Sequence, residues 1–135
     1  MKKKLSILGS TGSIGLNVLK IYNKRKKNFK INILAADKNY NLICKQIKNL
    51  KPSFFLINNL SIYNKIKKKF KKNKTQIIKD IVFEKNRLTM SDITVSAIPG
   101  IAGLTPTIEL IKKSKKLLIA NKESVICGWN LIDKT

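Results

Sequence analysis

The amino-acid sequence predicts a doubly wound α/β fold in a single domain covering residues 1–135, with a mostly parallel sheet and helices on both faces. Three observations lead to this fold class. An apolar run that begins at Leu5 breaks into a glycine-rich turn and then into a helical pattern. Strand-like and helix-like stretches alternate along the rest of the chain, as in α/β proteins. A length of 135 residues with 43% hydrophobic residues suits one ordinary core.

The glycine-rich turn contains three glycines spaced three residues apart, Gly9, Gly12 and Gly15. Gly9 is expected to turn the chain sharply, Gly12 to let backbone N–H groups approach a phosphate, and Gly15 to let the helix pack closely on the strand. The N-terminus of the helix would then face the pyrophosphate of a dinucleotide. Further donors can come from the hydroxyls between the glycines, those of Ser10, Thr11 and Ser13. A glycine-rich turn that binds nothing is the alternative.

The first half of the chain continues with helices and strands in alternation. A helix follows the glycines and ends in the polar run 23–28, and residues 29–36 form a strand with a nearly continuous apolar end, typical of a strand covered on both faces. A second helix ends before Pro52, and residues 54–57 form the next strand. The apolar residues on the inner faces of these two helices are Ile14, Val18 and Ile21, then Ile43, Ile47 and Leu50.

A third helix carries apolar residues every four positions, at Ile62, Ile66 and Phe70, with lysines on the remaining faces. This pattern favours a core-facing stripe with a solvated back. The alternative is a helix that binds nucleic acid, but no arginine lies among these lysines, and arginine is the residue favoured for nucleic-acid recognition.

The second half of the chain shows a clear pattern of secondary structure near its end but a weak one at its start. Residues 76–78 and 81–83 are expected to be short strands or helix ends, and residues 93–98 form a strand. A loop at 99–103 follows, and Thr105 is a candidate N-cap for another helix. The last strand covers residues 116–120, and a final helix is expected to follow at 125–132.

Two residues at the end of the second strand point to opposite nucleotide preferences. Asp37 lies where an acid usually accepts hydrogen bonds from the ribose hydroxyls of NAD, whereas Lys38 beside it favours the extra phosphate of NADP. A polar turn between strand and helix, with no role for either side chain in binding, is the alternative.

Composition limits the classes of function. The net charge is +22, but the lysines lie along most of the chain, which favours compositional drift over a nucleic-acid footprint. His is absent and the seven acidic residues do not cluster, so we expect neither a metal site nor a catalytic triad within this chain. The two cysteines form no C-x-x-C pair, the start shows no signal segment, and no stretch approaches a membrane span; together these features predict a cytoplasmic protein without a membrane partner.

Two separated motifs resemble one enzyme family. Residues 8–15 (LGSTGSIG) and 119–124 (IANKES) together closely resemble 1-deoxy-D-xylulose 5-phosphate reductoisomerase, and residues 102–107 are similar to that family as well. The likeness spans the whole chain, with a weak middle at about 60–90. The family rearranges and reduces 1-deoxy-D-xylulose 5-phosphate to 2-C-methyl-D-erythritol 4-phosphate in non-mevalonate isoprenoid biosynthesis. The resemblance therefore implies a Rossmann-type domain that binds NADPH.

The resemblance also implies a role for individual residues. Lys122 would touch the sugar phosphate substrate, and no catalytic residue is implied within this chain. Where the chain has Asp37, the family usually has glycine, and a carboxylate there should repel the 2′-phosphate unless it turns away. The residues implied to bind the cofactor are Thr11, Gly12, Ser13 and Ile14 at its phosphates, Lys38 and Asn39 at its 2′-phosphate, and Asn121 and Glu123 at its nicotinamide.

The metal of the family has no ligands in this sequence. The resemblance implies a divalent ion, Mg²⁺ or Mn²⁺, held by carboxylates beyond the position of Thr135, and a homodimer for the full-length enzyme. The ion is needed to polarise the substrate oxygens. We therefore expect a truncated chain, without the catalytic and C-terminal domains of the family, that binds cofactor but is inactive alone.

Three other interpretations stay open on the sequence alone. A homoserine-dehydrogenase-like domain also shows a glycine-rich start and a late Asn-Lys pair, although Glu123 and Ser124 favour the reductoisomerase. A basic nucleic-acid-binding module would show binding with a steep dependence on salt. A domain that folds but has lost its ligand is the third.

Overall fold

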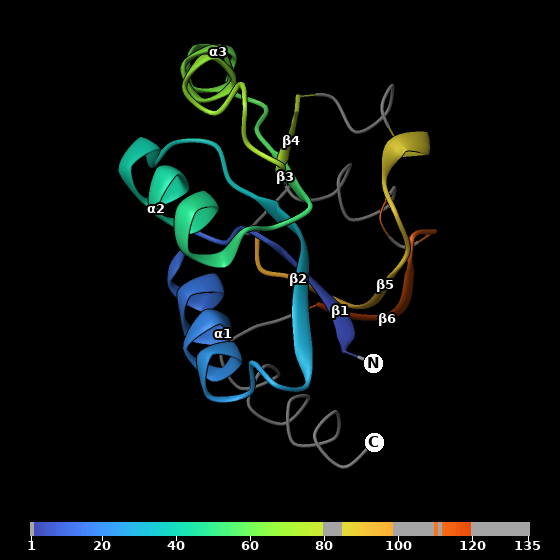
Figure 1. Ribbon diagram of the computed structural model, residues 1–135. Coiled ribbons are helices and arrows are strands. Elements are labelled where there is room, and N and C mark those ends of the chain that lie inside the picture. Colours follow the sequence, from blue (N-terminus) through green and yellow to red (C-terminus); the bar gives the residue numbers. More distant parts are fainter. Residues whose placement is uncertain (1, 80–84, 99–109, 111, 120–135) are drawn as a thin grey trace.

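The computed structural model describes residues 2–79, 85–98, 110 and 112–119. These residues form six strands, three α-helices and one 3₁₀ turn (Figure 1). In chain order the elements are β1 (Lys3–Leu8), α1 (Ser13–Lys24), β2 (Phe29–Ala35), α2 (Tyr40–Leu50), β3 (Phe54–Leu56), α3 (Leu60–Lys69), β4 (Gln76–Ile78), η1 (Lys85–Arg87), β5 (Ser91–Ser96) and β6 (Ser114–Ile119).

The six strands form one sheet in the order β4-β3-β2-β1-β5-β6, and every neighbouring pair is parallel. The chain therefore adds strands on one side of β1 as far as β4 and then crosses over to add β5 and β6 on the other side. The strand order reverses at β1, between β2 and β5. In open α/β sheets, ligands bind at the carboxyl ends of the strands at such a switch point. The predicted doubly wound parallel fold is confirmed.

The described helices α1, α2 and α3 cover one face of the sheet (Figure 1). Val18, Ile47 and Ile66, one from each helix, belong to a single buried cluster with the strand residues of that face. A second cluster lies on the other face, where Leu88 and Leu110 cover the strands. The helices predicted after Thr105 and at 125–132 lie outside the described residues, apart from Leu110, as does the short element predicted at 81–83.

Three strands begin two residues earlier than expected. β1 begins at Lys3, β5 at Ser91 and β6 at Ser114. Both serines are polar residues that the sheet accommodates through hydrogen bonds. The Ser91 hydroxyl lies 2.6 Å from that of Ser6, and the Ser114 hydroxyl donates to the carbonyl of Leu110 at 2.6 Å. An apolar pattern does not detect a strand residue of this kind.

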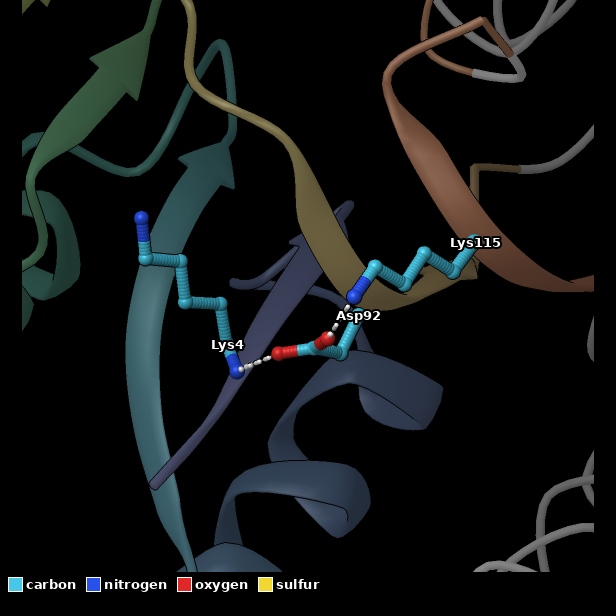
Figure 2. A network of polar contacts seen from close by, with 3 residues as sticks. All are labelled: Lys4, Asp92 and Lys115. Atoms are coloured by element: carbon cyan, nitrogen blue, oxygen red, sulfur yellow. Dashed lines mark hydrogen bonds and ion pairs between the residues drawn. The ribbon is translucent and has the colours of Figure 1, made fainter. Parts of the chain in front are cut away.

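At the amino edge of the sheet, a single carboxylate links three strands. Asp92, in β5, accepts a hydrogen bond from the backbone N–H of Lys4 in β1 at 2.7 Å and pairs with the ammonium of Lys115 in β6 at 3.2 Å. Figure 2 shows the Lys4 side chain directed away from the carboxylate while its backbone nitrogen faces it. The backbone hydrogen bond is the main reason that the pKa of Asp92 lies below its usual value, with Lys115 adding to it.

No helix within the described part of the chain is both long and apolar enough to cross a membrane.

Candidate functional site

The glycine-rich turn follows β1 at the carboxyl edge of the sheet. Gly9 has a φ of +84°, and a Cβ built on it would lie 3.0 Å from the carbonyl oxygen of Ala97 after β5. The N–H groups of Gly9 and Ser10 both donate to the carbonyl of Ala35 at the end of β2, at 2.8 and 2.9 Å. The turn is thus held between the two strands that flank β1, and the sharp change of direction predicted at Gly9 is confirmed.

The other two glycines have different roles. A Cβ on Gly15 would lie 2.1 Å from the Gly9 carbonyl oxygen, so α1 packs directly on the turn and only glycine fits there. A Cβ on Gly12 would meet only the same oxygen at 3.6 Å, an ordinary contact. The fold therefore requires Gly9 and Gly15, whereas the position of Gly12 at the start of α1 has room for a methyl group.

Gly12 is the N-cap of α1 and brings no side-chain acceptor to the first turn of the helix, which also contains no acidic residue. Ser13 and Ile14 are the first two residues of this helix. Backbone N–H groups at such an uncapped start, together with the positive end of the helix dipole, suit an anionic group.

A cavity of about 320 Å³ opens beside this turn. It is formed by the segments that follow four strands, β1, β2, β3 and β5. Polar and glycine residues on its wall are Gly9, Thr11, Gly12, Asp37, Lys38 and Asn58. Two larger grooves of about 750 Å³ each lie elsewhere, one between α1 and α2 and one at the amino edge of the sheet. We place the candidate site in the smaller cavity, because it alone of the three combines the strand ends of the switch point with the glycine turn.

The structure brings three predicted site residues of the first half of the chain to the cavity: Thr11, Gly12 and Lys38 line it. Ser13 and Ile14 begin α1, and Ser13 lines the groove between α1 and α2 instead. The Asn39 side chain serves as the N-cap of α2, where Oδ1 accepts a hydrogen bond from the N–H of Leu42 at 3.2 Å.

The remaining predicted residues, Asn121, Lys122 and Glu123, lie outside the described residues. The strand that precedes them is β6, whose last residue, Ile119, pairs with Ser96 at the carboxyl edge.

The hydroxyl of Ser10 does not have the role expected from the sequence. It is fully buried and donates to Oε1 of Gln46 in α2 at 2.8 Å, while Nε2 of Gln46 donates to the Ser10 carbonyl at 2.9 Å. Ser10 therefore faces the interior of the protein. Gln46 was missed in the sequence, although its spacing of three from Ile43 places it beside the buried face of its helix.

Asp37 makes a contact that the sequence did not reveal. Its Oδ1 accepts a hydrogen bond from the backbone N–H of Asn58, the second residue after β3, at 2.8 Å. The carboxylate therefore joins the turn after β2 to the turn after β3 at the rim of the cavity.

The residues that the structure describes contain no group of three or more His, Cys, Asp and Glu able to hold a metal ion.

Comparison with known proteins shows similarity over almost the whole chain. Residues 5–128 match the family model for 1-deoxy-D-xylulose 5-phosphate reductoisomerase. The enzyme of that name from Pelagibacter ubique is 40% identical over 137 residues, which cover 98% of this chain and 35% of the relative. The enzyme from Buchnera aphidicola of Schizaphis graminum is 38% identical, over 93% of this chain and 33% of the relative. The chain thus spans about a third of the length of these curated relatives.

Comparison with solved structures shows the same family similarity in the fold. The reductoisomerase from Zymomonas mobilis in complex with NADPH aligns with a TM-score of 0.78 and 27% identity, over 92% of this chain and 33% of that one. A reductoisomerase in complex with NADPH, fosmidomycin and magnesium aligns with a TM-score of 0.78 and 27% identity, over 92% of this chain and 31% of that one.

Proposed function

This chain belongs to the 1-deoxy-D-xylulose 5-phosphate reductoisomerase family, and we propose that it is the NADPH-binding portion of such an enzyme. The observation that carries the proposal is the absence of a side chain at Gly12, which lines the cavity at the switch point of the sheet and stands at the uncapped start of α1. A diphosphate fits this arrangement, because backbone N–H groups can approach it where no side chain intervenes.

In the proposed complex, the residues of the turn and the helix start bind the cofactor phosphates: Thr11, Gly12, Ser13 and Ile14. Lys38 and Asn39 lie at the end of β2, where the 2′-phosphate would bind. Lys38 supplies a positive charge for the phosphate. The side-chain oxygen of Asn39 caps α2, and its side-chain NH2 group can donate hydrogen bonds to the phosphate.

The second half of the site belongs to the segment after β6. We propose that Asn121 and Glu123 bind the nicotinamide side of the cofactor and that Lys122 binds the phosphate of the substrate. Bound NADPH would supply hydride for the reduction step, and a divalent metal, Mg²⁺ or Mn²⁺, would polarise the substrate oxygens. The residues of this chain bind and orient the nucleotide.

We further propose that the complete enzyme acts on 1-deoxy-D-xylulose 5-phosphate in isoprenoid biosynthesis, as a cytoplasmic homodimer. Its partners would be the cofactor and a small sugar phosphate, not nucleic acid or a membrane. The metal-binding carboxylates implied by the family are not among these 135 residues, so the decisive assay for this chain is nucleotide binding.

The test is titration of the purified chain with NADPH, followed by nucleotide fluorescence. Because the net charge of +22 attracts any polyphosphate, the titration is made at two salt concentrations and with inorganic triphosphate as competitor. We expect saturable binding that persists at physiological salt and resists triphosphate. Binding that triphosphate removes, together with tight and steeply salt-dependent binding of nucleic acid, would favour the basic module instead.

A further inference from the structure

The rim of the cavity carries an acidic residue at the place where a dinucleotide presents its adenosine ribose. Asp37 is the second residue after β2, is exposed to solvent, and lines the same cavity as Gly9 and Gly12. In dinucleotide-binding sheets an acidic residue at this position hydrogen-bonds the 2′-hydroxyl of the ribose. NADH has a 2′-hydroxyl there and NADPH has a phosphate, so the charge at this position bears on the choice between them.

The carboxylate is held in place by the backbone. Oδ1 accepts from the N–H of Asn58 at 2.8 Å, which ties the side chain across the gap between the ends of β2 and β3. A carboxylate has about four acceptor positions on two oxygens, so this bond leaves others for a ligand hydroxyl. The position of Asp37 therefore follows from the fold and requires no bound nucleotide.

The charge of Asp37 is not neutralised by the described part of the protein. No lysine or arginine nitrogen among the described residues lies within 4.0 Å of its carboxylate. Lys38 lines the cavity beside it and attracts anions, but it forms no ion pair with Asp37. A phosphate bound at this rim would therefore lie near the fixed carboxylate of Asp37 and the ammonium group of Lys38, which stands at the end of a long side chain.

We propose that Asp37 sets the nucleotide preference of this chain, accepting a hydrogen bond from the 2′-hydroxyl of NADH and opposing the 2′-phosphate of NADPH. The inference rests on the proposed nucleotide-binding function and refines it. Asp37 and Lys38 act in opposite directions, so the chain binds the two nucleotides with Kd values within about tenfold of each other.

The test compares NADPH and NADH titrations of the parent chain with those of Asp37→Asn. Asparagine keeps an oxygen for the Asn58 N–H and removes only the charge, so the turn stays in place. We expect the Kd for NADPH to fall about tenfold and the Kd for NADH to change little or to rise, which increases the preference for NADPH by about tenfold or more. Asp37→Gly removes the hydrogen bond as well and serves as a second variant, with a shift in the same direction.

Asp92→Asn is the matched control, because it removes the same charge at the opposite edge of the sheet. Its NADPH to NADH preference should equal that of the parent. If both nucleotides bind and the preference of Asp37→Asn and Asp37→Gly stays within twofold of the parent, the inference is wrong and the proposed function stands. If neither nucleotide binds the parent chain or any folded variant, the proposed function fails and the inference fails with it.

Discussion

The side chain of Gln46 holds Ser10 through both ends of its amide. Oε1 accepts from the Ser10 hydroxyl at 2.8 Å, and Nε2 donates to the Ser10 carbonyl at 2.9 Å. Both side chains are buried, and the pair joins α2 to the turn between β1 and α1. The glycine-rich turn is therefore held by a helix that does not itself line the candidate cavity.

The first prediction concerns this support. Gln46→Leu keeps the size of the side chain but removes both hydrogen bonds, leaving the buried Ser10 hydroxyl and carbonyl without their partner. We expect a loss of about 1–3 kcal/mol in the free energy of unfolding. We also expect weaker NADPH binding, because the turn is no longer fixed. Urea denaturation and fluorescence titration measure the two effects.

Asn49→Ala is the control for Gln46→Leu, since Asn49 is exposed on the same helix. Its free energy of unfolding should change by less than about 0.5 kcal/mol. Unchanged NADPH affinity in a folded Gln46→Leu chain would show that the turn keeps its shape without Gln46.

The second prediction separates the glycines of the turn. Gly12→Ala should fold with nearly the stability of the parent, because its Cβ meets only the Gly9 carbonyl oxygen at 3.6 Å. It should nevertheless lose most of its NADPH affinity, because the methyl group would occupy the position proposed for the cofactor phosphates. Gly15→Ala places a Cβ 2.1 Å from the same oxygen and should destabilise the fold itself. Thermal unfolding followed by circular dichroism, with nucleotide titration beside it, distinguishes the two.

Retained nucleotide affinity in Gly12→Ala would contradict the placement of the phosphates at this turn. A Gly15→Ala chain as stable as the parent would mean that α1 can move away from the turn.

The order of the elements and the glycine turn could be predicted from the sequence because both depend on local patterns. The apolar spacing at Ile43 and Ile47 predicts a buried helix face whatever that face packs against. Gly9 predicts a turn because glycine readily adopts a positive φ, which is +84° here. Thr11, Gly12 and Lys38 lie together at the cavity for the same reason, since each follows a strand of a parallel sheet.

Contacts between distant polar residues could not be predicted in this way. The bonds from Gln46 to Ser10 and from Asn58 to Asp37 span 36 and 21 residues, and no local pattern specifies the partner of a polar side chain. Ser91 shows the same limit within a strand. It is fully buried although it is polar, because a hydroxyl on the neighbouring strand satisfies it.

The third prediction tests whether the lysine-rich helix α3 is a structural element. Ile66 is fully buried in the core cluster on the helix-covered face of the sheet, whereas Lys68 is exposed. Ile66→Val should lower the free energy of unfolding by about 0.5–1.5 kcal/mol. Lys68→Gln should change it by less than about 0.5 kcal/mol. Chemical denaturation of both variants gives the comparison, and the reverse order of effects would argue that the charged face, rather than the apolar stripe, holds the helix.

The last prediction uses the pKa of Asp92. Hydrogen bonding to the backbone of Lys4, with Lys115 nearby, lowers this pKa in the folded chain, so the ionised carboxylate stabilises the fold wherever the pH lies above the pKa of the unfolded chain. That contribution is lost as the pH falls through the lower, folded-state pKa. Asp92→Asn should therefore be less stable than the parent by about 1 kcal/mol at pH 7, and the difference should shrink below about pH 4.

Urea denaturation of the parent and Asp92→Asn at a series of pH values from 7 to about 3 measures this difference directly. Lys115→Gln is the companion variant. The Lys115 side chain is 71% exposed, so its ion pair should contribute less than about 0.5 kcal/mol and should weaken with added salt. The backbone hydrogen bond from Lys4 is less exposed to screening and should persist. The prediction is wrong if the difference in free energy of unfolding between the parent and Asp92→Asn stays constant down to about pH 3, or if added salt abolishes it. Either result would mean that the hydrogen bond between the Asp92 carboxylate and β1 does not cause the difference.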